Sequence, residues 1–313
     1  MARFESPQVL VLGGGGILGE AWMTAVLAGL AEASGFDPRD CDGFVGTSAG
    51  AIVATALSAG VEPSTRLGDL PEQPPVAAAD VAGDRGLPAR ALNLAVTAGR
   101  GAAAPLALVG LRATEAGGGL LRKAALRRVP TGRRSLGGLG RELERAGARW
   151  DGRLSVAAVE LESGRRVMFG APGAPGAPGA PEAAIAAAVE ASCSIPGVFR
   201  PVVIARRSYV DGGAWSPTNM DRAPAGRGTR VLCLNPTGST RSSLGTRLGA
   251  LGLLSRSIAG IEALALERQG ASVTTISPDE VSLAAIGTNM MDPRRRSRVL
   301  AAGVSQGRAL AGR

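Results

Sequence analysis

The feature that most constrains the fold is an apolar run, close to the start of the chain, that ends in a row of glycines. Residues 8–12, QVLVL, predict a strand buried on both faces, because the run shows no alternation of polar and apolar positions. The pattern AWMTAVLAGLAEA, between Glu20 and Ala33, predicts a helix after the glycines. A strand, a glycine-rich turn and a helix in this order are typical of α/β domains with a parallel sheet.

The rest of the chain continues this alternation. Residues 43–60, GFVGTSAGAIVATALSAG, predict a short strand, a tight turn and a second helix. Later strands are predicted at RLSVAAVEL and RRVMFG, VVIARRSYVDGG, RVLCLNP and SVTTISP, and later helices at 136–148, 181–192, 247–270 and 292–311. We therefore expect one domain, residues 1–313, with three α/β/α layers and a mostly parallel central sheet. Residues 61–150 are expected to form a helical cap, and the repeat APGAPGAPGAP at 171–181 a surface loop.

The chain contains no histidine, which excludes a Ser-His-Asp triad, a Cys-His pair and every histidine-ligated metal site. Its three cysteines are far apart in the sequence and form no CxxC motif, so neither a disulfide framework nor a zinc site is indicated. The start of the chain lacks the features of a signal peptide, and no apolar run is long enough to span a membrane. These features together predict a cytoplasmic protein.

The net charge is +9 and the isoelectric point is about 11, and such a surface attracts anionic partners. With one Tyr and five Phe there is little on which nucleic-acid bases can stack, so a nucleic-acid partner is not expected. The run RRRSR at 294–298 is a candidate for peripheral contact with anionic membrane, and a solvated helix face is the alternative. Preference for Arg over Lys is also what the codon usage of a GC-rich bacterial genome produces.

The candidate nucleophile is Ser48, within the G-x-S-x-G sequence that runs from Gly46 to Gly50. An apolar strand precedes this sequence and an apolar helix follows it, which is the context of a nucleophile elbow. Small residues around the serine allow the tight turn, and the helix N-terminus favours developing negative charge. The alternative is a serine that only caps the second helix.

The glycines at 14–19 have the spacing G-x-G-x-x-G, which raises the possibility of a dinucleotide site. That fingerprint needs an acidic residue at the end of the second strand. The aspartates of 35–42 precede the second strand, and that strand ends at Ser48 instead, so the dinucleotide hypothesis is the weaker one. The backbone N–H groups of Gly14, Gly15 and Gly16 can instead form an oxyanion hole. Tight packing of the turn against the helix is a third explanation.

In the absence of histidine, the base must be another group, and Asp211 in YVDGGAW is a candidate. It follows a predicted strand, and the two glycines after it allow a close approach to another loop. A carboxylate within hydrogen-bond reach of a serine hydroxyl can accept its proton directly. The residues alone do not single out Asp211, because Asp-Gly is also a common turn sequence.

Three segments together, GGGGILG, GTSAG and DGG in this order, resemble the patatin-like phospholipase family. ASCSIPGVFRPVVI at 191–204 is similar to the family's segment just before its aspartate strand. GTNMMDPRRRSRVLAAGVSQGRAL at 287–310 is similar to its C-terminal helix region. The resemblance covers about residues 8–310, is weakest across 61–150, and implies a patatin-like fold.

The resemblance implies a metal-free, cofactor-free hydrolase of phospholipids or other acyl esters that works through a Ser-Asp dyad and an acyl-enzyme. The residues it assigns are the nucleophile Ser48, the base Asp211, the oxyanion-hole residues Gly14, Gly15 and Gly16, and the elbow residues Gly46 and Gly50.

Two departures from the family's pattern keep open a catalytically weak or inactive lipid-binding protein. Leu18 occupies a position where many members carry a cation, and Glu20 follows it with a negative charge. AWSPTN follows the DGG sequence, where the family often has small or Asn-rich residues.

Overall fold

The computed structural model describes residues 4–68, 122–170, 180–238 and 247–312. Most of the expected cap at 61–150 and almost all of the expected loop at 171–181 lie outside the described residues.

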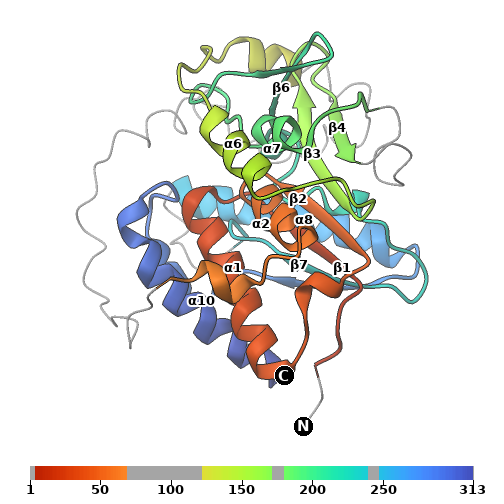
Figure 1. Ribbon diagram of the computed structural model, residues 1–313, viewed down its shortest axis with the longest axis vertical. Coiled ribbons are helices and arrows are strands. Elements are labelled where there is room, and N and C mark those ends of the chain that lie inside the picture. The colour runs from red at the N-terminus through yellow and green to blue at the C-terminus, as the bar shows by residue number, and fades with distance from the viewer. Residues whose placement is uncertain (1–3, 69–121, 171–179, 239–246, 313) are drawn as a thin grey trace.

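A single mixed sheet forms the centre of the described structure (Figure 1). Its strands are β1 (Val9–Leu12), β2 (Gly43–Thr47), β3 (Leu154–Glu160), β4 (Arg166–Gly170), β5 (Val202–Ile204), β6 (Arg207–Asp211), β7 (Arg230–Leu234) and β8 (Ser272–Ile276). They lie in the order β5-β6-β3-β2-β1-β7-β8, and β4 pairs with β3. Strands β3, β2, β1, β7 and β8 are parallel, and the pairs β3–β4, β3–β6 and β5–β6 are antiparallel. The mostly parallel sheet that the sequence predicts is confirmed.

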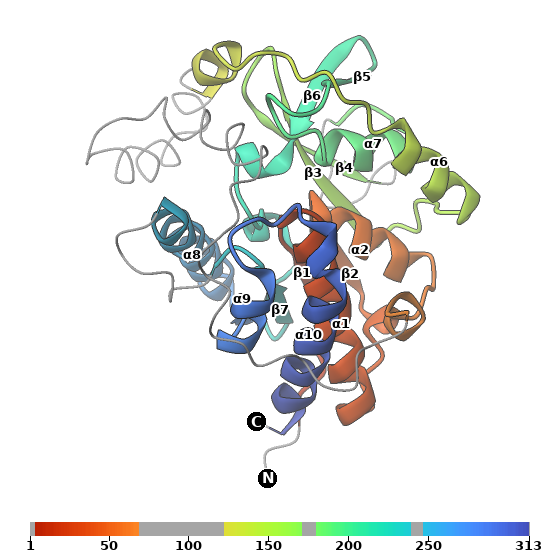
Figure 2. The ribbon, with the colours of Figure 1, turned by 90° about the vertical axis from the view of Figure 1, so that its left-hand side faces the viewer.

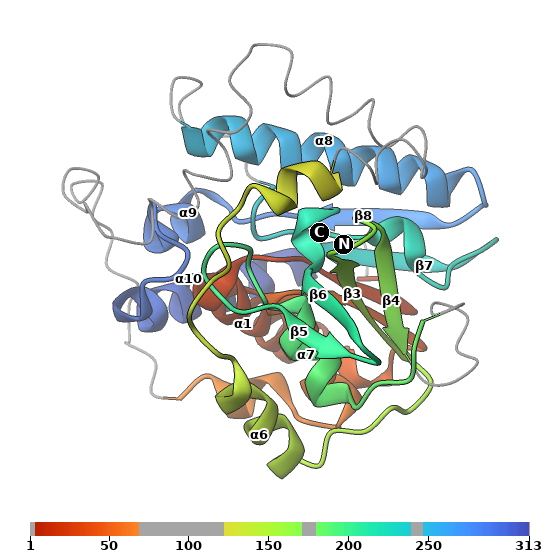
Figure 3. The same ribbon diagram turned by 90° about the horizontal axis from the view of Figure 1, so that it is seen from above.

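Helices cover both faces of this sheet, which confirms the predicted three-layer α/β architecture. They are α1 (Gly16–Ser34), α2 (Ala49–Ser58), α6 (Gly137–Arg145), α7 (Ile185–Ser192), α8 (Arg247–Glu267), α9 (Glu280–Ile286) and α10 (Arg296–Ala311). One apolar core packs α1, α2, α7 and α10 against the sheet, and a second packs α8 against the other face. Figure 3 shows α8 on one side of the sheet and α1 and α10 on the other. Among the described helices, none combines the length and the apolar content that a bilayer crossing requires.

Helix α1 packs closely against α10 along its length, as Figures 1 and 2 show. A Cβ atom on Gly29 would lie 2.2 Å from the carbonyl oxygen of Val304, and one on Gly307 would lie 2.2 Å from that of Val26. The two helix backbones can approach this closely only because both positions are glycine. The packing fixes the axis of α1, and so the direction in which its N-terminal glycines point.

The helices differ from the prediction in several of their bounds and in one additional helix. Helix α1 begins at Gly16 rather than at Glu20, so part of the glycine loop forms the first helical turn. The short helix α9 was not predicted, and its N-terminus is capped by Asp279, whose carboxylate accepts a hydrogen bond from the Ser282 N–H. A helix this short has little periodicity to detect in a sequence.

Candidate active site

The two candidate catalytic residues meet because β2 and β6 pair with the same strand. Residues Phe44–Thr47 of β2 run parallel to the first half of β3, and β6 runs antiparallel to its second half. Thr47 pairs with Ala157, and Asp211 pairs with the next residue, Ala158. Since the two strands approach from opposite directions, their C-terminal ends meet. The turn after β2 and the turn after β6 therefore lie next to each other.

Ser48 occupies the sharp turn between β2 and α2, as the sequence predicts. Its backbone has φ 53° and ψ −120°, a conformation that residues other than glycine rarely adopt and that costs on the order of 1–3 kcal/mol. The neighbouring glycines make this turn possible. A Cβ atom on Gly46 would lie 2.5 Å from the Ala51 Cα, and one on Gly50 would lie 1.8 Å from the Leu12 carbonyl oxygen.

The Ser48 hydroxyl donates a hydrogen bond of 2.7 Å to Oδ2 of Asp211. The other carboxylate oxygen of Asp211, Oδ1, accepts a hydrogen bond of 2.7 Å from the Gly213 N–H, which fixes the orientation of the carboxylate. Ser48 is 5% exposed and Asp211 is 6% exposed. Burial raises the pKa of Asp211 to about 6, although its hydrogen bonds from Ser48 and Gly213 act in the opposite direction. The carboxylate is therefore a stronger base than an exposed aspartate.

The C-terminal end of α7 and the two residues after it contact both turns, and their role was not predicted from the sequence. The Ser48 N–H donates a hydrogen bond of 2.8 Å to the Ser192 hydroxyl, and the Asp211 N–H donates one of 3.0 Å to the Ser194 carbonyl oxygen. Cys193 lies between them, and burial, together with the Asp211 charge, raises the pKa of its thiol. The thiol therefore stays protonated at neutral pH, which leaves Ser48 as the nucleophile candidate.

The glycine loop lies beside the nucleophile turn. A Cβ atom on Gly14 would lie 3.5 Å from the Ser48 Cβ, so this part of the loop touches the serine. The Gly14 N–H already donates a hydrogen bond of 2.8 Å to the Pro217 carbonyl oxygen. Within the described part of the chain, the N–H groups of Gly15 and Gly16 have no hydrogen-bond partner. They also lie at the N-terminus of α1, where a helix favours negative charge, so these two groups are free to bind an oxyanion.

The two residues in which the loop departs from the family's pattern are both buried. The side chain of Leu18 packs in the core beneath the loop, and its N–H donates a hydrogen bond of 3.0 Å to the Met290 carbonyl oxygen. The Glu20 carboxylate forms ion pairs with Arg66, at 2.9 Å, and with Arg296. Two guanidinium groups thus offset the charge of Glu20, which the sequence had predicted to add negative charge near the loop.

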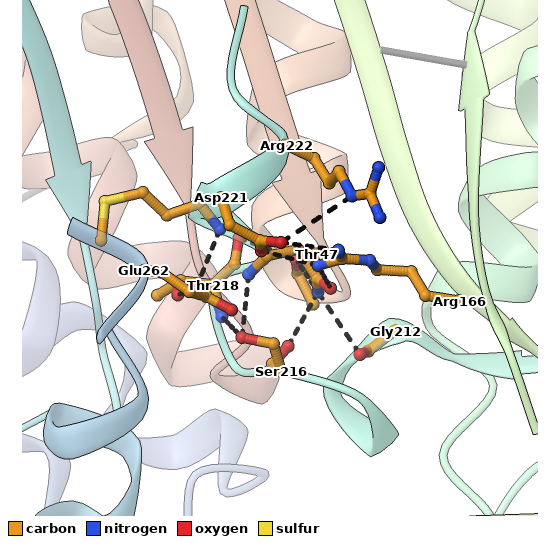
Figure 4. A network of polar contacts seen from close by, with 10 residues as sticks. Thr47, Arg166, Gly212, Ser216, Thr218, Asp221, Arg222 and Glu262 are labelled. Carbon is orange, nitrogen blue, oxygen red and sulfur yellow. Dashed lines mark hydrogen bonds and ion pairs between the residues drawn. The ribbon is translucent and has the colours of Figure 1, made fainter. Parts of the chain in front are cut away.

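The amide of Asn219 connects the nucleophile turn to the base turn. Its Nδ2 atom donates hydrogen bonds to the Thr47 hydroxyl, at 3.0 Å, and to the carbonyl oxygens of Ser216, at 2.8 Å, and Gly212, at 3.4 Å. Thr47 directly precedes Ser48, and Gly212 directly follows Asp211. Figure 4 shows Thr47, Gly212 and Ser216 converging on this point. Asn219 belongs to the AWSPTN stretch and adopts the left-handed region at φ 50°, which asparagine tolerates well.

A partly buried ionic network supports Asn219 (Figure 4). Arg166 donates to both carboxylate oxygens of Asp221, at 2.7 and 2.6 Å, and also to Oδ1 of Asn219, at 3.2 Å. Burial raises the pKa of Asp221, but hydrogen bonds with Arg166 and Glu262 and the charges of Arg166 and Arg222 together lower it by more, so the pKa lies below its usual value. Glu262 of α8 accepts hydrogen bonds from the Met220 N–H, at 2.9 Å, and from the Thr218 hydroxyl. No sequence pattern indicated this network, because its members are isolated polar residues in different elements.

The acidic residues at 35–42 are not placed for dinucleotide binding. The 3-10 turn Pro38–Asp40 precedes β2, and the Asp37 carboxylate pairs with Arg39 at 2.6 Å. The strand β2 ends at the nucleophile turn, as expected.

The fold and the site together define a three-layer α/β protein with a buried serine–aspartate pair. A sequence model of the family described as patatin-like phospholipase matches residues 10–73 and 169–224. These segments contain the glycine loop, the nucleophile turn and the base turn. The predicted resemblance to this family is confirmed over these two segments. No curated protein matches the chain.

Two solved structures are similar to the chain. VipD from Legionella pneumophila has 17% sequence identity and a TM-score of 0.45, with 99% of this chain and 67% of that chain covered. The type III effector protein ExoU has 17% identity and a TM-score of 0.39, with 99% of this chain and 54% of that chain covered.

Proposed function

We propose that the chain hydrolyses carboxylic esters of lipids, as a phospholipase A or a related acyl hydrolase. The observation that carries the proposal is the 2.7 Å hydrogen bond between the Ser48 hydroxyl and Asp211, in a buried site next to a helix N-terminus. The match to the patatin-like phospholipase family supports lipid as the substrate class. The proposal includes one catalytic domain, residues 1–313, in which 61–150 serve as a cap.

The proposed reaction has two steps. In the first, Asp211 accepts the hydroxyl proton as Ser48 Oγ attacks the ester carbonyl, and the N–H groups of Gly15 and Gly16 stabilise the oxyanion. The proton passes to the leaving alcohol or lysolipid, and an acyl-enzyme remains on Ser48. In the second step Asp211 accepts a proton from water, which attacks the acyl-enzyme. The fatty acid leaves, and the proton returns to Ser48.

A fluorophosphonate probe tests whether Ser48 is activated. We expect covalent modification of the full chain at one site, which mass spectrometry of peptides locates to Ser48. The Ser48→Ala variant is the control and should not be labelled. An unmodified Ser48 in the folded chain would instead support the lipid-binding alternative, which is favoured by the buried Leu18 and the engaged Gly14 N–H.

The rate of hydrolysis should depend on pH through Asp211. Only the carboxylate form can accept the serine proton, and a raised pKa means that protonation begins near pH 6 instead of near pH 4. We therefore expect kcat/KM on a soluble short-chain ester to rise about tenfold per pH unit below pH 6 and to level off above it. A stopped assay across this range measures the profile. A rate that stays constant down to about pH 4.5 contradicts the assignment of Asp211 as the base.

A further inference from the structure

A concentration of positive charge lies on the segment that follows the undescribed part of the expected cap. Residues 122–134 contain six basic residues and no acidic residue. Four of these arginines and one from a neighbouring loop are exposed, and we call this group the arginine strip: Arg127, Arg128, Arg133, Arg134 and Arg200.

The arginine strip has no acidic partner in the part of the chain that the structure describes. None of its five guanidinium groups forms an ion pair or a side-chain hydrogen bond there. The basic run at 294–298 is different, because Arg294 pairs with Asp292 and Arg296 pairs with Glu20. Like charges brought together without a partner repel each other, so an anionic surface would relieve this repulsion. The strip therefore replaces 294–298 as the candidate for contact with anionic lipid.

Backbone contacts hold the arginine strip in a defined shape. The Arg134 N–H donates a hydrogen bond of 3.4 Å to the Val198 carbonyl oxygen, and the Arg200 N–H donates one of 2.9 Å to the Arg134 carbonyl oxygen. A Cβ atom on Gly132 would lie 2.4 Å from the Phe199 N, so the two chain segments are in direct contact. The backbone that carries Arg133, Arg134 and Arg200 is therefore held in place before binding, so little backbone conformational entropy is lost there when a surface is bound.

The segment that carries the strip is fastened to the loops of the candidate active site. At one end, the Arg122 guanidinium lies 3.8 Å from the ring centre of Trp215 and donates to the Ala214 carbonyl oxygen at 3.1 Å, close after the base Asp211. At the other end, the segment pairs with residues 198–200, which follow Ser192, the partner of the Ser48 N–H. Figures 2 and 3 show the segment passing along β5 and β6 towards α6. A surface bound to the strip is thus held next to the loops that flank Ser48 and Asp211.

We propose that the arginine strip docks the chain onto membrane surfaces rich in anionic phospholipid. An arginine close to an anionic bilayer strengthens binding several-fold, and the strip offers five. Val203, on β5 just beyond Arg200, is 67% exposed and provides an apolar side chain that the interface of a bilayer can accept. None of the exposed residues of 122–134 is aromatic, so the segment exposes no ring on which a nucleic-acid base could stack fully, which favours lipid over nucleic acid. The docking itself does not depend on the proposed function. Only the role of the bound membrane as the source of substrate rests on it.

The test compares two double variants that each remove two positive charges. Both are made in the Ser48→Ala protein, so that hydrolysis does not change the vesicles. The first is Arg133→Gln with Arg134→Gln. The matched control is Arg227→Gln with Arg268→Gln, two exposed arginines near the N-terminal end of β7, outside the strip. Co-sedimentation measures binding to phosphatidylcholine vesicles with and without about 30% phosphatidylserine.

We expect the parent protein to bind the phosphatidylserine vesicles, and to bind them more weakly as NaCl rises from about 0.1 M to about 0.5 M. The strip variant should bind them at least about 10-fold more weakly, and the control variant within about twofold of the parent. Equal binding to pure phosphatidylcholine, no binding to either vesicle, or an equal loss in the control overturns the proposal. The proposal is also overturned if the parent protein binds single-stranded RNA more tightly than the phosphatidylserine vesicles and the strip variant loses this RNA binding. Probe labelling of Ser48 is a separate measurement, so docking and hydrolysis can fail independently.

Discussion

Replacing Ser48 with Ala is expected to lower kcat/KM for ester hydrolysis by at least about 10³-fold, and Asp211→Asn should have an effect of the same order. Each change removes one partner of the hydrogen bond between the hydroxyl and the carboxylate. Without the hydroxyl no acyl-enzyme can form, and without the carboxylate the hydroxyl loses the acceptor to which it donates. Initial rates on a soluble short-chain ester measure the effect.

The two losses should not add. Either single substitution already breaks the pair, so the second one has little left to remove. The activity of the double variant should therefore be close to that of the less active single variant. Ser257→Ala is the matched control, because this exposed hydroxyl donates only to the Leu253 carbonyl oxygen of its own helix and should be replaceable without loss. A double variant whose loss equals the product of the two single losses would show that Ser48 and Asp211 act separately.

The second large effect concerns stability. Gly50→Ala is expected to lower the free energy of unfolding by about 3–5 kcal/mol, because the new Cβ would lie 1.8 Å from the Leu12 carbonyl oxygen. The Leu12 carbonyl belongs to β1 and the Gly50 backbone belongs to α2, and both elements lie in the core. The overlap cannot be relieved without shifting one of them. A loss of this size is a large part of the stability of a typical domain. Urea unfolding followed by circular dichroism measures it.

Gly260→Ala is the matched control for this change. Gly260 lies within α8, and a Cβ atom there would meet no atom within 4 Å. The substitution should leave the protein as stable or raise the free energy of unfolding by about 0.5–1 kcal/mol, because alanine favours the helix. An unchanged urea midpoint for Gly50→Ala would mean that the turn has room that the structure does not show.

Much of the fold could be predicted because its signals are local. The apolar run at 8–12 and the glycines after it predict a strand and a turn whatever the rest of the chain does. The same holds for Ser48, whose turn needs small neighbours and lies between an apolar strand and an apolar helix. Helix α9 escaped prediction because its seven residues span only two turns. Its capping residue, Asp279, follows a proline and looks like part of a loop.

The partners of the site could not be predicted, because they depend on contacts between residues far apart in the chain. Asp211 was selected by resemblance alone, since nothing in its own surroundings distinguishes it from other Asp-Gly turns. Ser192 is the last residue of α7 and Asn219 lies in a loop, and their hydrogen bonds to Ser48 and Thr47 join residues more than a hundred positions apart in the chain. The sequence likewise could not show which N–H groups of the glycine loop are available. Among the described residues, the Gly14 N–H donates to the Pro217 carbonyl oxygen, and those of Gly15 and Gly16 do not have a partner.

The shared edge of β3 has an evolutionary consequence. Because neighbouring residues of this one strand set where the Ser48 and Asp211 side chains lie, the geometry of the proposed catalytic pair depends on a few backbone hydrogen bonds. Substitutions elsewhere in the chain can therefore accumulate over generations without moving this pair, provided that the register of these three strands is kept.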